Sequence, residues 1–314
     1  MTLTVGIDVG GTKIAGGVVD DRGNVLVTAR RESPATDTRE MEEAIEDLVQ
    51  ELRTMHDIAA VGVGAAGFID ARRSTVLFSP NLAWRNEPLR RDLEARIGLP
   101  VVIENDANAA AWGEFTFGAG VEVDDFLLVT VGTGVGGGVV LNGELHRGAF
   151  GVGGEIGHIR VVPGGRICGC GNRGCWEQYA SGTALVRDTR EQVSQGSLIA
   201  RSLLDRAGGD IAGIDGPLIT AAAKDGDAFA IEQLQGLGKW LGEGVATLAA
   251  VLDPAMVVIG GGVSEAGDPL LDPIRAHFAA NLTGRDYRPE LSIRGAVLGN
   301  QAGLIGAADL ARRP

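Results

Sequence analysis

A short glycine-rich pattern occurs twice in this chain, and the repeat restricts the possible folds more than any other feature. Residues 8–19 are DVGGTKIAGGVV and residues 131–140 are VGTGVGGGVV. At a constant separation of 121 residues, the identical pairs are Gly11/Gly132, Thr12/Thr133, Gly16/Gly137, Gly17/Gly138, Val18/Val139 and Val19/Val140. Glycine-rich segments match one another easily, but the threonine and valine pairs lie in the same strand context. The repeat therefore predicts a duplicated three-stranded β-meander with a glycine turn at its first corner.

Strand and helix patterns alternate along the rest of the chain. Asp37 and Glu40 have the spacing of a capping box, and the apolar stripe that follows predicts a helix. Further strands are predicted at residues 58–63, 101–104 and 256–259, and further helices at residues 90–96, 107–115, 176–193, 229–252, 269–282 and 302–312. We expect an α/β fold in two lobes, residues 1–116 with 301–314 and residues 117–300. The C-terminal helix is expected to pack back on the first lobe.

The charge balance and the low aromatic content exclude two classes of partner. Acidic residues number 41 against 28 basic ones, the net charge is −13, and aromatic residues make up 4%. Binding to nucleic acid or to an anionic membrane depends on a basic surface, and base stacking needs aromatic rings. No signal peptide is visible, and Asp253-Pro254 interrupts the longest apolar region, residues 245–262. We expect a soluble, cytoplasmic protein.

All three cysteines of the chain lie close together, with one of its four histidines nearby. The residues are His158, Cys168, Cys170 and Cys175, between Glu155 and Glu177. Three thiolates and an imidazole are a common ligand set for a closed, structural zinc site. The alternative is a set of small buried residues or a disulfide, but three cysteines cannot all pair and their density is low. The sequence therefore predicts a zinc loop inserted in the second lobe.

The first glycine turn, Asp8-x-Gly10-Gly11-Thr12-Lys13, has groups that suit phosphate. Backbone N–H groups of such a turn can face an anion, and the threonine and lysine side chains add donors. Another strand follows, so the turn is neither a Walker loop nor a dinucleotide-binding element. Taken alone, an ordinary glycine hairpin explains it equally well. Two such turns in two duplicated lobes favour binding of a triphosphate by both.

Asp106 is the candidate general base. It follows a buried strand and begins a helix, where ligands bind in open α/β sheets and where the helix dipole favours a carboxylate. Its structural alternative is a helix N-cap. The neighbouring amide of Asn105, which can bind a hydroxyl group, favours a site for a polar substrate.

These motifs together resemble the ROK group of sugar kinases (repressors, open reading frames, kinases), within the actin and hexokinase-like ATPase fold. The resemblance covers essentially the whole chain and is greatest to glucokinases of actinobacterial type. The matching motifs are DVGGTK at 8–13, GAAG at 64–67, PNLxW at 80–84, ENDANAAAWGE at 104–114, VGTGVGGG at 131–138, EIGH at 155–158, CGCGxxGCWE at 168–177 and VIGGGV at 258–263.

The resemblance implies ATP bound between the lobes with Mg²⁺ held by Asp8 through water. The phosphates would lie against Asp8, Gly10, Gly11, Thr12 and Lys13 and against Gly132, Thr133, Gly134, Gly136, Gly137 and Gly138. Gly261 and Gly262 would lie near the adenosine. The sugar would be held by Gly67, Asn105, Asp106, Glu155, His158 and Glu177, with Asn81 at its edge. His158 would use one ring nitrogen for zinc and the other for the sugar.

The implied reaction is phosphorylation of glucose at its 6-hydroxyl, with Asp106 accepting the proton. The expected assembly is a homo-oligomer, either a dimer or a tetramer. A ROK kinase for mannose, fructose or an N-acetylhexosamine is the nearest alternative, because sequence does not show how the pocket distinguishes one hydroxyl. A sugar-sensing ROK repressor is disfavoured, because its DNA-binding segment precedes the kinase-like domain and Asp8 lies near the start of this chain.

Overall fold

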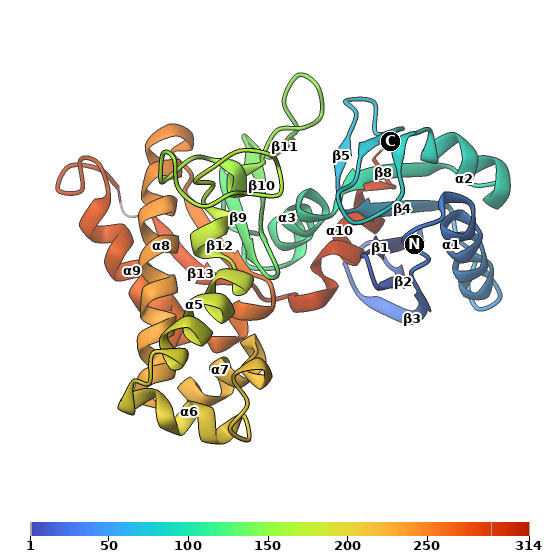
Figure 1. Ribbon diagram of the computed structural model, residues 1–314. Coiled ribbons are helices and arrows are strands. Elements are labelled where there is room, and N and C mark those ends of the chain that lie inside the picture. Colours follow the sequence, from blue (N-terminus) through green and yellow to red (C-terminus); the bar gives the residue numbers. More distant parts are fainter. Residues whose placement is uncertain (1, 290, 314) are drawn as a thin grey trace. The chain divides into compact units, whose positions relative to one another are not determined.

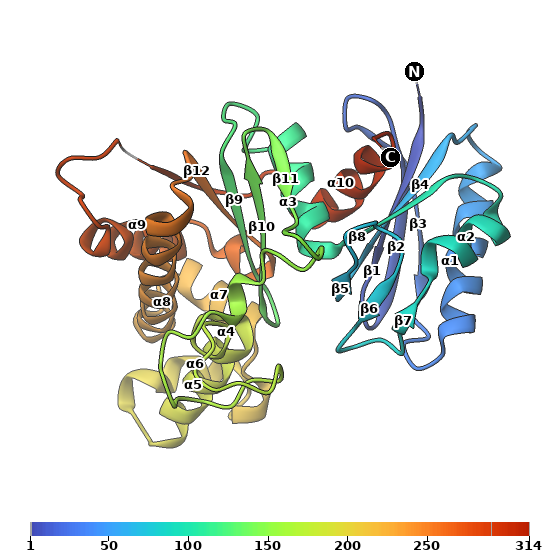
Figure 2. The same cartoon turned by 90° about the horizontal axis from the view of Figure 1, so that it is seen from above.

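The computed structural model describes residues 2–289 and 291–313. It contains two five-stranded sheets with the same strand plan, and Figures 1 and 2 show how their strands are arranged. The first has the order β3-β2-β1-β4-β8 and the second the order β11-β10-β9-β12-β13. Each begins as a meander, β1–β3 or β9–β11, and continues beyond its first strand with two strands from later in the chain, β4 and β8 or β12 and β13. The predicted α/β fold with duplicated meanders is confirmed.

The elements have the following bounds. The first sheet consists of β1 (Thr4–Val9), β2 (Lys13–Val19), β3 (Val25–Glu32), β4 (Ala60–Ala65) and β8 (Val101–Asn105). The second consists of β9 (Phe126–Val131), β10 (Val135–Leu141), β11 (Glu144–His146), β12 (Met256–Gly260) and β13 (Ser292–Gly295). A small sheet contains β5 (Phe68–Ile69), β6 (Val76–Phe78) and β7 (Arg85–Glu87). The helices are α1 (Thr38–Arg53), α2 (Leu89–Ile97), α3 (Asp106–Phe117), α4 (Glu177–Ala180), α5 (Gly182–Ser194), α6 (Arg201–Arg206), α7 (Gly216–Lys224), α8 (Ala228–Leu252), α9 (Asp268–Asn281) and α10 (Ala302–Leu310).

The chain divides into two compact units. Unit 1 contains residues 1–128, 137–154 and 297–314, and unit 2 contains residues 129–136 and 155–296. Residues 137–154 group with unit 1 because β10 packs closely on α3: a Cβ atom at Gly138 would lie 2.3 Å from the Cβ of Ala111. The lobe boundaries at 116/117 and 300/301 stay a prediction.

In unit 1 the first sheet is covered on both faces. Helices α1 and α2 lie on one face and α10 on the other (Figure 2). Two glycines of the sheet make the close approach of α10 possible, because a Cβ atom at Gly6 or Gly62 would lie 1.8 Å from a carbonyl oxygen of α10. Thr4 adds a hydrogen bond of 2.8 Å from its hydroxyl to the carbonyl of Ala308. The C-terminal helix therefore packs on the first unit, as predicted.

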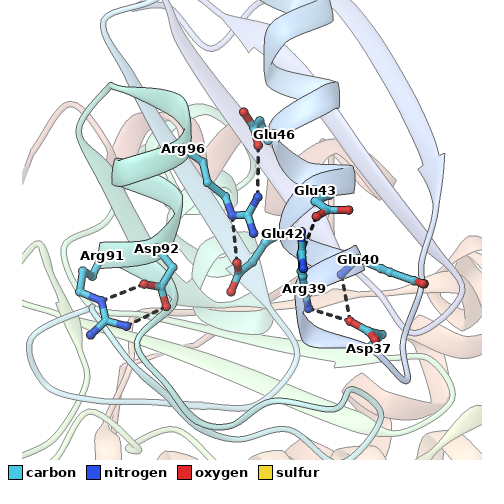
Figure 3. Close-up of polar contacts among 9 residues, drawn as sticks. All are labelled: Asp37, Arg39, Glu40, Glu42, Glu43, Glu46, Arg91, Asp92 and Arg96. Carbon is cyan, nitrogen blue, oxygen red and sulfur yellow. Dashed lines mark hydrogen bonds and ion pairs between the residues drawn. The ribbon is translucent and has the colours of Figure 1, made fainter.

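Ion pairs and a cap fix the outer helices of unit 1 (Figure 3). Asp37 caps α1 by accepting hydrogen bonds from the backbone N–H groups of Arg39 (2.9 Å) and Glu40 (3.0 Å), so the predicted helix start is confirmed. Arg96 of α2 donates to Glu42 (3.1 Å) and Glu46 (3.4 Å) of α1. These contacts hold α1 and α2 together over the sheet.

The single helix predicted at residues 176–193 is wrong. The chain forms α4 and α5 instead, with Ser181 between them in an extended conformation (φ −95°, ψ 165°). Its hydroxyl caps α5 by accepting a hydrogen bond of 3.1 Å from the N–H of Ala184. The N–H of Gly182 bonds to the carbonyl of Gly132 at 2.8 Å, and a continuous helix would break this contact. The apolar pattern alone does not reveal the break.

Unit 2 contains the long helix α8, which packs against α9 (Figure 1). Two glycines of α8, Gly238 and Gly242, face α9. A Cβ atom at Gly238 would lie 2.7 Å from Pro273, and one at Gly242 would lie 2.5 Å from the carbonyl oxygen of Ile274. Gly236, on the exposed face of the same helix, has no such neighbour within 4 Å. Within the described residues, no helix has both the length and the apolar character needed to cross a membrane.

Gly242 and Gly236 give a matched pair of substitutions in one helix, one facing α9 and one exposed. Gly242→Ala should destabilise the protein by about 1–3 kcal/mol, because the added methyl group forces α8 and α9 apart. Gly236→Ala should stabilise it by roughly 0.5–1 kcal/mol, because alanine restricts the unfolded chain and introduces no clash. Chemical denaturation of both variants measures the two shifts. Equal shifts of the same sign would contradict the packing described.

Candidate active site

Two acidic side chains meet at one edge of the sheet in unit 1. Strands β1, β4 and β8 are parallel, with Asp8 paired to Gly64 and Gly64 paired to Glu104. Because the carboxyl ends of parallel strands lie at the same edge, Asp8 and Asp106 come together there. Gly64 lies between them without a side chain, and a Cβ atom at this position would lie 3.7 Å from the Cα of Asp106. The sequence-predicted magnesium and base residues are therefore neighbours.

Burial disfavours the charge of both acids. Burial raises the pKa of Asp8 from its ordinary value of 3.8 to about 6, the negative charge of Asp106 acts in the same direction, and Lys13 opposes them. Burial also raises the pKa of Asp106, against the hydrogen bonds that its carboxylate accepts from the backbone N–H groups of Ala107 and of Asp106 itself. Raised pKa values in a pair of acids are typical of groups that bind metal or move protons.

The helix N-cap of α3 is Asn105 and not Asp106, which leaves the carboxylate of Asp106 outside the capping role. The side-chain oxygen of Asn105 accepts a hydrogen bond of 3.0 Å from the N–H of Asn108, and its amide donates to the carbonyl of Gly67 at 3.1 Å. Gly67 has φ +149°, and a Cβ atom there would lie 2.4 Å from the carbonyl oxygen of Phe78. Asn105 and Gly67 thus form one fixed corner beside Asp106.

The first glycine turn closes with a hydrogen bond of 3.0 Å from the N–H of Gly10 to the carbonyl of Lys13. Gly11, Thr12 and Lys13 are exposed, so their donors are available to a ligand. Asn81 lies beside the turn, because a Cβ atom at Gly11 would lie 3.6 Å from the Cβ of Asn81. These contacts keep the turn open on its outer side.

Contacts within unit 2 fix the conformation of the second glycine turn. The N–H of Gly132 bonds to the carbonyl of Gly134 at 3.0 Å, and the hydroxyl of Thr183 bonds to the carbonyl of Thr133 at 2.7 Å. Glu177 accepts a hydrogen bond of 3.1 Å from the N–H of Val135. The α5 start and Glu177 therefore set the shape of this turn.

A pocket of about 950 Å³ opens beside the second turn. The turn supplies Gly132 and Thr133, and the segment after β12 supplies Gly262, Val263 and Glu265. The rest of the wall comes from α5 and α7: Gly182, Thr183, Val186, Arg187, Arg190, Gly216, Pro217, Thr220, Ala221 and Lys224. Gly261 has φ +82° and lies against the backbone of Val131, which brings Gly262 to the pocket.

Sequence analysis did not identify the α5 and α7 residues of this wall. They carry no motif, and they line a pocket only because two separate helices pack beside the turn. The sequence signal that existed was local: Asp215 precedes Gly216-Pro217, a typical helix start that indicates α7 but not its role.

The four predicted zinc ligands come together in unit 2. The ligand atoms of His158, Cys168, Cys170 and Cys175 all lie within 4.8 Å of one another. The Cys168 Sγ is 3.6 Å from the His158 Nδ1, and the Cys170 and Cys175 Sγ atoms are 3.6 Å apart. Ligand atoms around a tetrahedral zinc are roughly 3.5–3.8 Å apart, so the residues fit the metal. The three cysteines are free thiols, which removes the disulfide alternative.

His158 has its two ring nitrogens on different sides. Nδ1 faces the cysteines, and Nε2 lies 3.9 Å from a carboxylate oxygen of Glu155. Glu177 has one oxygen 3.8 Å from the Cys168 Sγ and the other on the N–H of Val135. The proposed sugar-binding residues Glu155, His158 and Glu177 therefore lie beside the metal cluster.

A second group of carboxylates is an ion-pair cluster and not a candidate site. Oxygens of Glu42, Glu87 and Asp92 lie within 4.8 Å of one another. Arg96 pairs with Glu42 at 3.1 Å, and Arg91 pairs with Asp92 at 2.8 Å (Figure 3). The guanidinium groups already supply the positive charge that a cation would bring.

Comparison with known proteins connects these features. The ROK family model matches residues 4–314. A glucokinase of Streptomyces coelicolor is 50% identical over 314 residues, covering 100% of this chain and 99% of the relative. The crystal structure of a ROK family glucokinase from Streptomyces griseus in complex with glucose and AMPPNP has 51% identity and a TM-score of 0.91, covering 99% of this chain and 100% of that one. A ROK hexokinase structure from Thermus thermophilus has 34% identity and a TM-score of 0.79, covering 99% and 98%.

The raised pKa of Asp8 predicts a gain in stability when its charge is removed. In the folded state Asp8 binds its proton more tightly than in the unfolded chain. The free energy of unfolding therefore decreases as the pH rises from 3.8 to about 6. Without nucleotide or Mg²⁺, Asp8→Asn should stabilise the protein by about 1–3 kcal/mol at pH 8. The gain should disappear as pH falls below the unfolded value. Thermal unfolding at pH 8 and pH 4, with exposed Asp21→Asn as control, measures it; a loss of stability at pH 8 would contradict the burial.

Removal of a metal ligand should remove zinc and stability together. Cys170→Ser leaves three ligands, so the purified variant should contain far less than one zinc per chain and unfold at a lower temperature. Arg173→Ala in the same loop should retain the metal, because Arg173 is not one of the four ligands and its guanidinium donates to the carbonyl of Gly165 at 3.4 Å. Elemental analysis and calorimetry give both quantities. A stable, metal-free Cys170→Ser protein would exclude a structural zinc.

Proposed function

The chain belongs to the ROK family, and from this membership we propose that it transfers the γ-phosphoryl group of ATP to the 6-hydroxyl of glucose. The main support is the 50% identity over the full length to a glucokinase. A structure 51% identical to this chain was solved with glucose and an ATP analogue. The enzyme class is a phosphotransferase with an alcohol acceptor.

Asp106 acts as the general base in this proposal. It accepts the proton of the sugar 6-hydroxyl while the oxygen attacks the γ-phosphorus in line. Its buried place raises its pKa, and a base works best when its pKa approaches the working pH. The α3 cap is made by Asn105, so the carboxylate of Asp106 remains available for the proton.

The phosphates of ATP lie against the glycine turns. Exposed donors of Gly11, Thr12 and Lys13 suit this role in unit 1. In unit 2, Gly132 and Thr133 belong both to the second turn and to the wall of the 950 Å³ pocket. One ligand can therefore extend from the turn into the pocket, with its phosphates on Gly132 and its nucleoside against α5, α7 and Gly262. Phosphoryl transfer depends mainly on such positioning and charge stabilisation.

Asp8 is the residue we assign to Mg²⁺, through a water molecule. The ion, when bound, neutralises charge on the phosphates. A cation beside Asp8 would offset the unfavourable burial and the repulsion from Asp106 that raise its pKa. The acid is therefore suited to a ligand that carries positive charge.

Zinc is structural in this proposal. Four protein ligands leave no open position for a catalytic water. If Nδ1 of His158 held the metal, its Nε2 would carry the proton and could donate a hydrogen bond to a sugar hydroxyl, beside the carboxylate of Glu155. Glu177, Asn105 and Gly67 complete the proposed sugar contacts.

Another hexose remains the second candidate, because one similar structure is a hexokinase and not a glucokinase. The cytoplasmic location and the homo-oligomer stay predictions.

The function is tested by an ATP-coupled kinase assay with glucose, mannose, fructose and N-acetylglucosamine. Glucose should give the highest kcat/KM. Asp106→Asn should lower kcat by about 10²–10⁴-fold while glucose binding, measured by calorimetry, persists. Asp21→Asn, on the surface of unit 1, should match the wild type. Near-normal turnover of Asp106→Asn would overturn the base assignment, and glucose binding without turnover in the wild type would favour a sensor.

A further inference from the structure

Glu104, the residue before Asn105 and Asp106, is a buried carboxylate that the proposed reaction does not use. Its side chain is 1% exposed. One oxygen accepts hydrogen bonds from the N–H of Asn105 (3.0 Å), from the side-chain amide of Asn108 (3.1 Å) and from the Nε of Arg147 (3.1 Å). The other oxygen lies 2.8 Å from the Nε of Arg147 and 3.2 Å from the Nε of Arg73.

Arg147 joins this carboxylate to a neighbouring turn of unit 1. Its guanidinium donates to the carbonyls of Asp70 (2.9 Å) and Ala71 (3.0 Å), in the turn between β5 and β6. The loop that follows Arg147 packs on the same turn, since a Cβ atom at Gly151 would lie 2.4 Å from the carbonyl oxygen of Ile69. Three segments therefore meet at Glu104: the start of α3, the β5–β6 turn and residues 147–154.

Glu104 also has a partner within α3, the buried Asn108. Its amide nitrogen is used by Glu104, and its side-chain oxygen has no hydrogen-bond partner among the described residues. A Cβ atom at Gly154, the residue before Glu155, would lie 3.6 Å from that oxygen. Glu104 thus sets the orientation of two asparagines on either side of Asp106, one through its backbone and one through its side chain.

Stability alone does not account for a buried carboxylate that is paired with two arginines. Apolar residues of similar volume are often as stabilising as a buried ion pair, whereas loss of one partner leaves an unpaired charge. The same network does fix geometry, because each member has a defined direction and the partners are largely buried. A misplacement of about 1 Å at a reacting group can lower a rate 10²-fold.

We propose that Glu104 is a positioning residue for phosphoryl transfer, and that Arg147 acts with it. Together they hold Asn105 and Asp106 at the end of β8 in the geometry that the sugar hydroxyl requires. The proposal rests on the function proposed above. It assigns to Glu104 no contact with sugar or nucleotide.

Steady-state kinetics of the full chain with glucose and ATP test the proposal. Glu104→Gln keeps the shape of the side chain but replaces the carboxylate that pairs with the two arginines by a neutral amide. It should raise the glucose KM and lower kcat, with kcat/KM for glucose falling about 10- to 100-fold, while the ATP KM stays unchanged. Arg147→Lys keeps the charge but cannot reach three acceptors, so it should change the same two constants in the same direction. In the double variant the losses should not multiply, because both substitutions break one network.

Glu114→Gln is the matched control. Glu114 is a fully buried acid of α3, the helix that Asp106 begins, and it accepts hydrogen bonds from the N–H groups of Ala119 (3.0 Å) and Leu298 (2.7 Å). This substitution should lower the unfolding temperature and leave both KM values unchanged. The proposal is overturned if Glu104→Gln behaves like this control, or if Arg147→Lys leaves the glucose KM at the wild-type value. Should Glu104→Gln fail to fold, Arg147→Lys decides.

Glucose affinity without ATP separates this proposal from the proposed function. If the wild type binds glucose but does not turn it over, the kinase function fails. Weaker glucose binding by Arg147→Lys, measured by calorimetry, would still support the positioning role, and unchanged binding would overturn it.

Discussion

The first unit depends on keeping two acidic side chains, Asp8 and Asp106, in a place that disfavours their charge. Parallel strands bring them to one edge, and Gly64 leaves the space between them open. Burial raises the pKa of each acid. A protein optimised only for stability would not place two carboxylates there, because their burial and mutual repulsion cost free energy. This cost in free energy is explained if the two acids serve to bind a cation and a proton.

Close backbone approach is the second constraint, and glycine meets it in both units. In unit 1 the carbonyls of α10 lie where the side chains of Gly6 and Gly62 would be, and this fixes the sheet against the last helix. In unit 2 an oxygen of Glu177 occupies the place of a Cβ atom at Gly134. The same sheet order in both halves provides the frame, while these contacts decide how near each helix or side chain can come to it.

The features that could be predicted from the sequence are those determined by residues close together along the chain. The Asp37 cap, the two meanders and the cysteine cluster each depend on a short pattern, and the fold follows from their order. The break at Ser181 depends on contacts that Gly182 and Thr183 make with Gly132 and Thr133, about fifty residues away in the chain. The α7 side of the pocket wall depends on the packing of α7 against α5 and α8. Sequence also could not decide whether Asp106 or Asn105 caps α3, because both residues are good N-caps and only the backbone geometry distinguishes them.

The zinc loop also has a connection that its motif does not suggest. Glu177 lies beside Cys168 with one oxygen and accepts the N–H of Val135 with the other. The metal cluster, the side chain of Glu177 and the second glycine turn thus form one continuous set of contacts inside unit 2. His158 continues the set in the other direction, from the cysteines to Glu155. A metal that only stabilised a surface loop would need neither the contact of Cys168 with Glu177 nor that of His158 with Glu155. Because both contacts start at residues of the cluster, a metal bound there would order groups proposed for the sugar and for the phosphates at once. That effect would give a non-catalytic metal a reason to lie beside the chemistry.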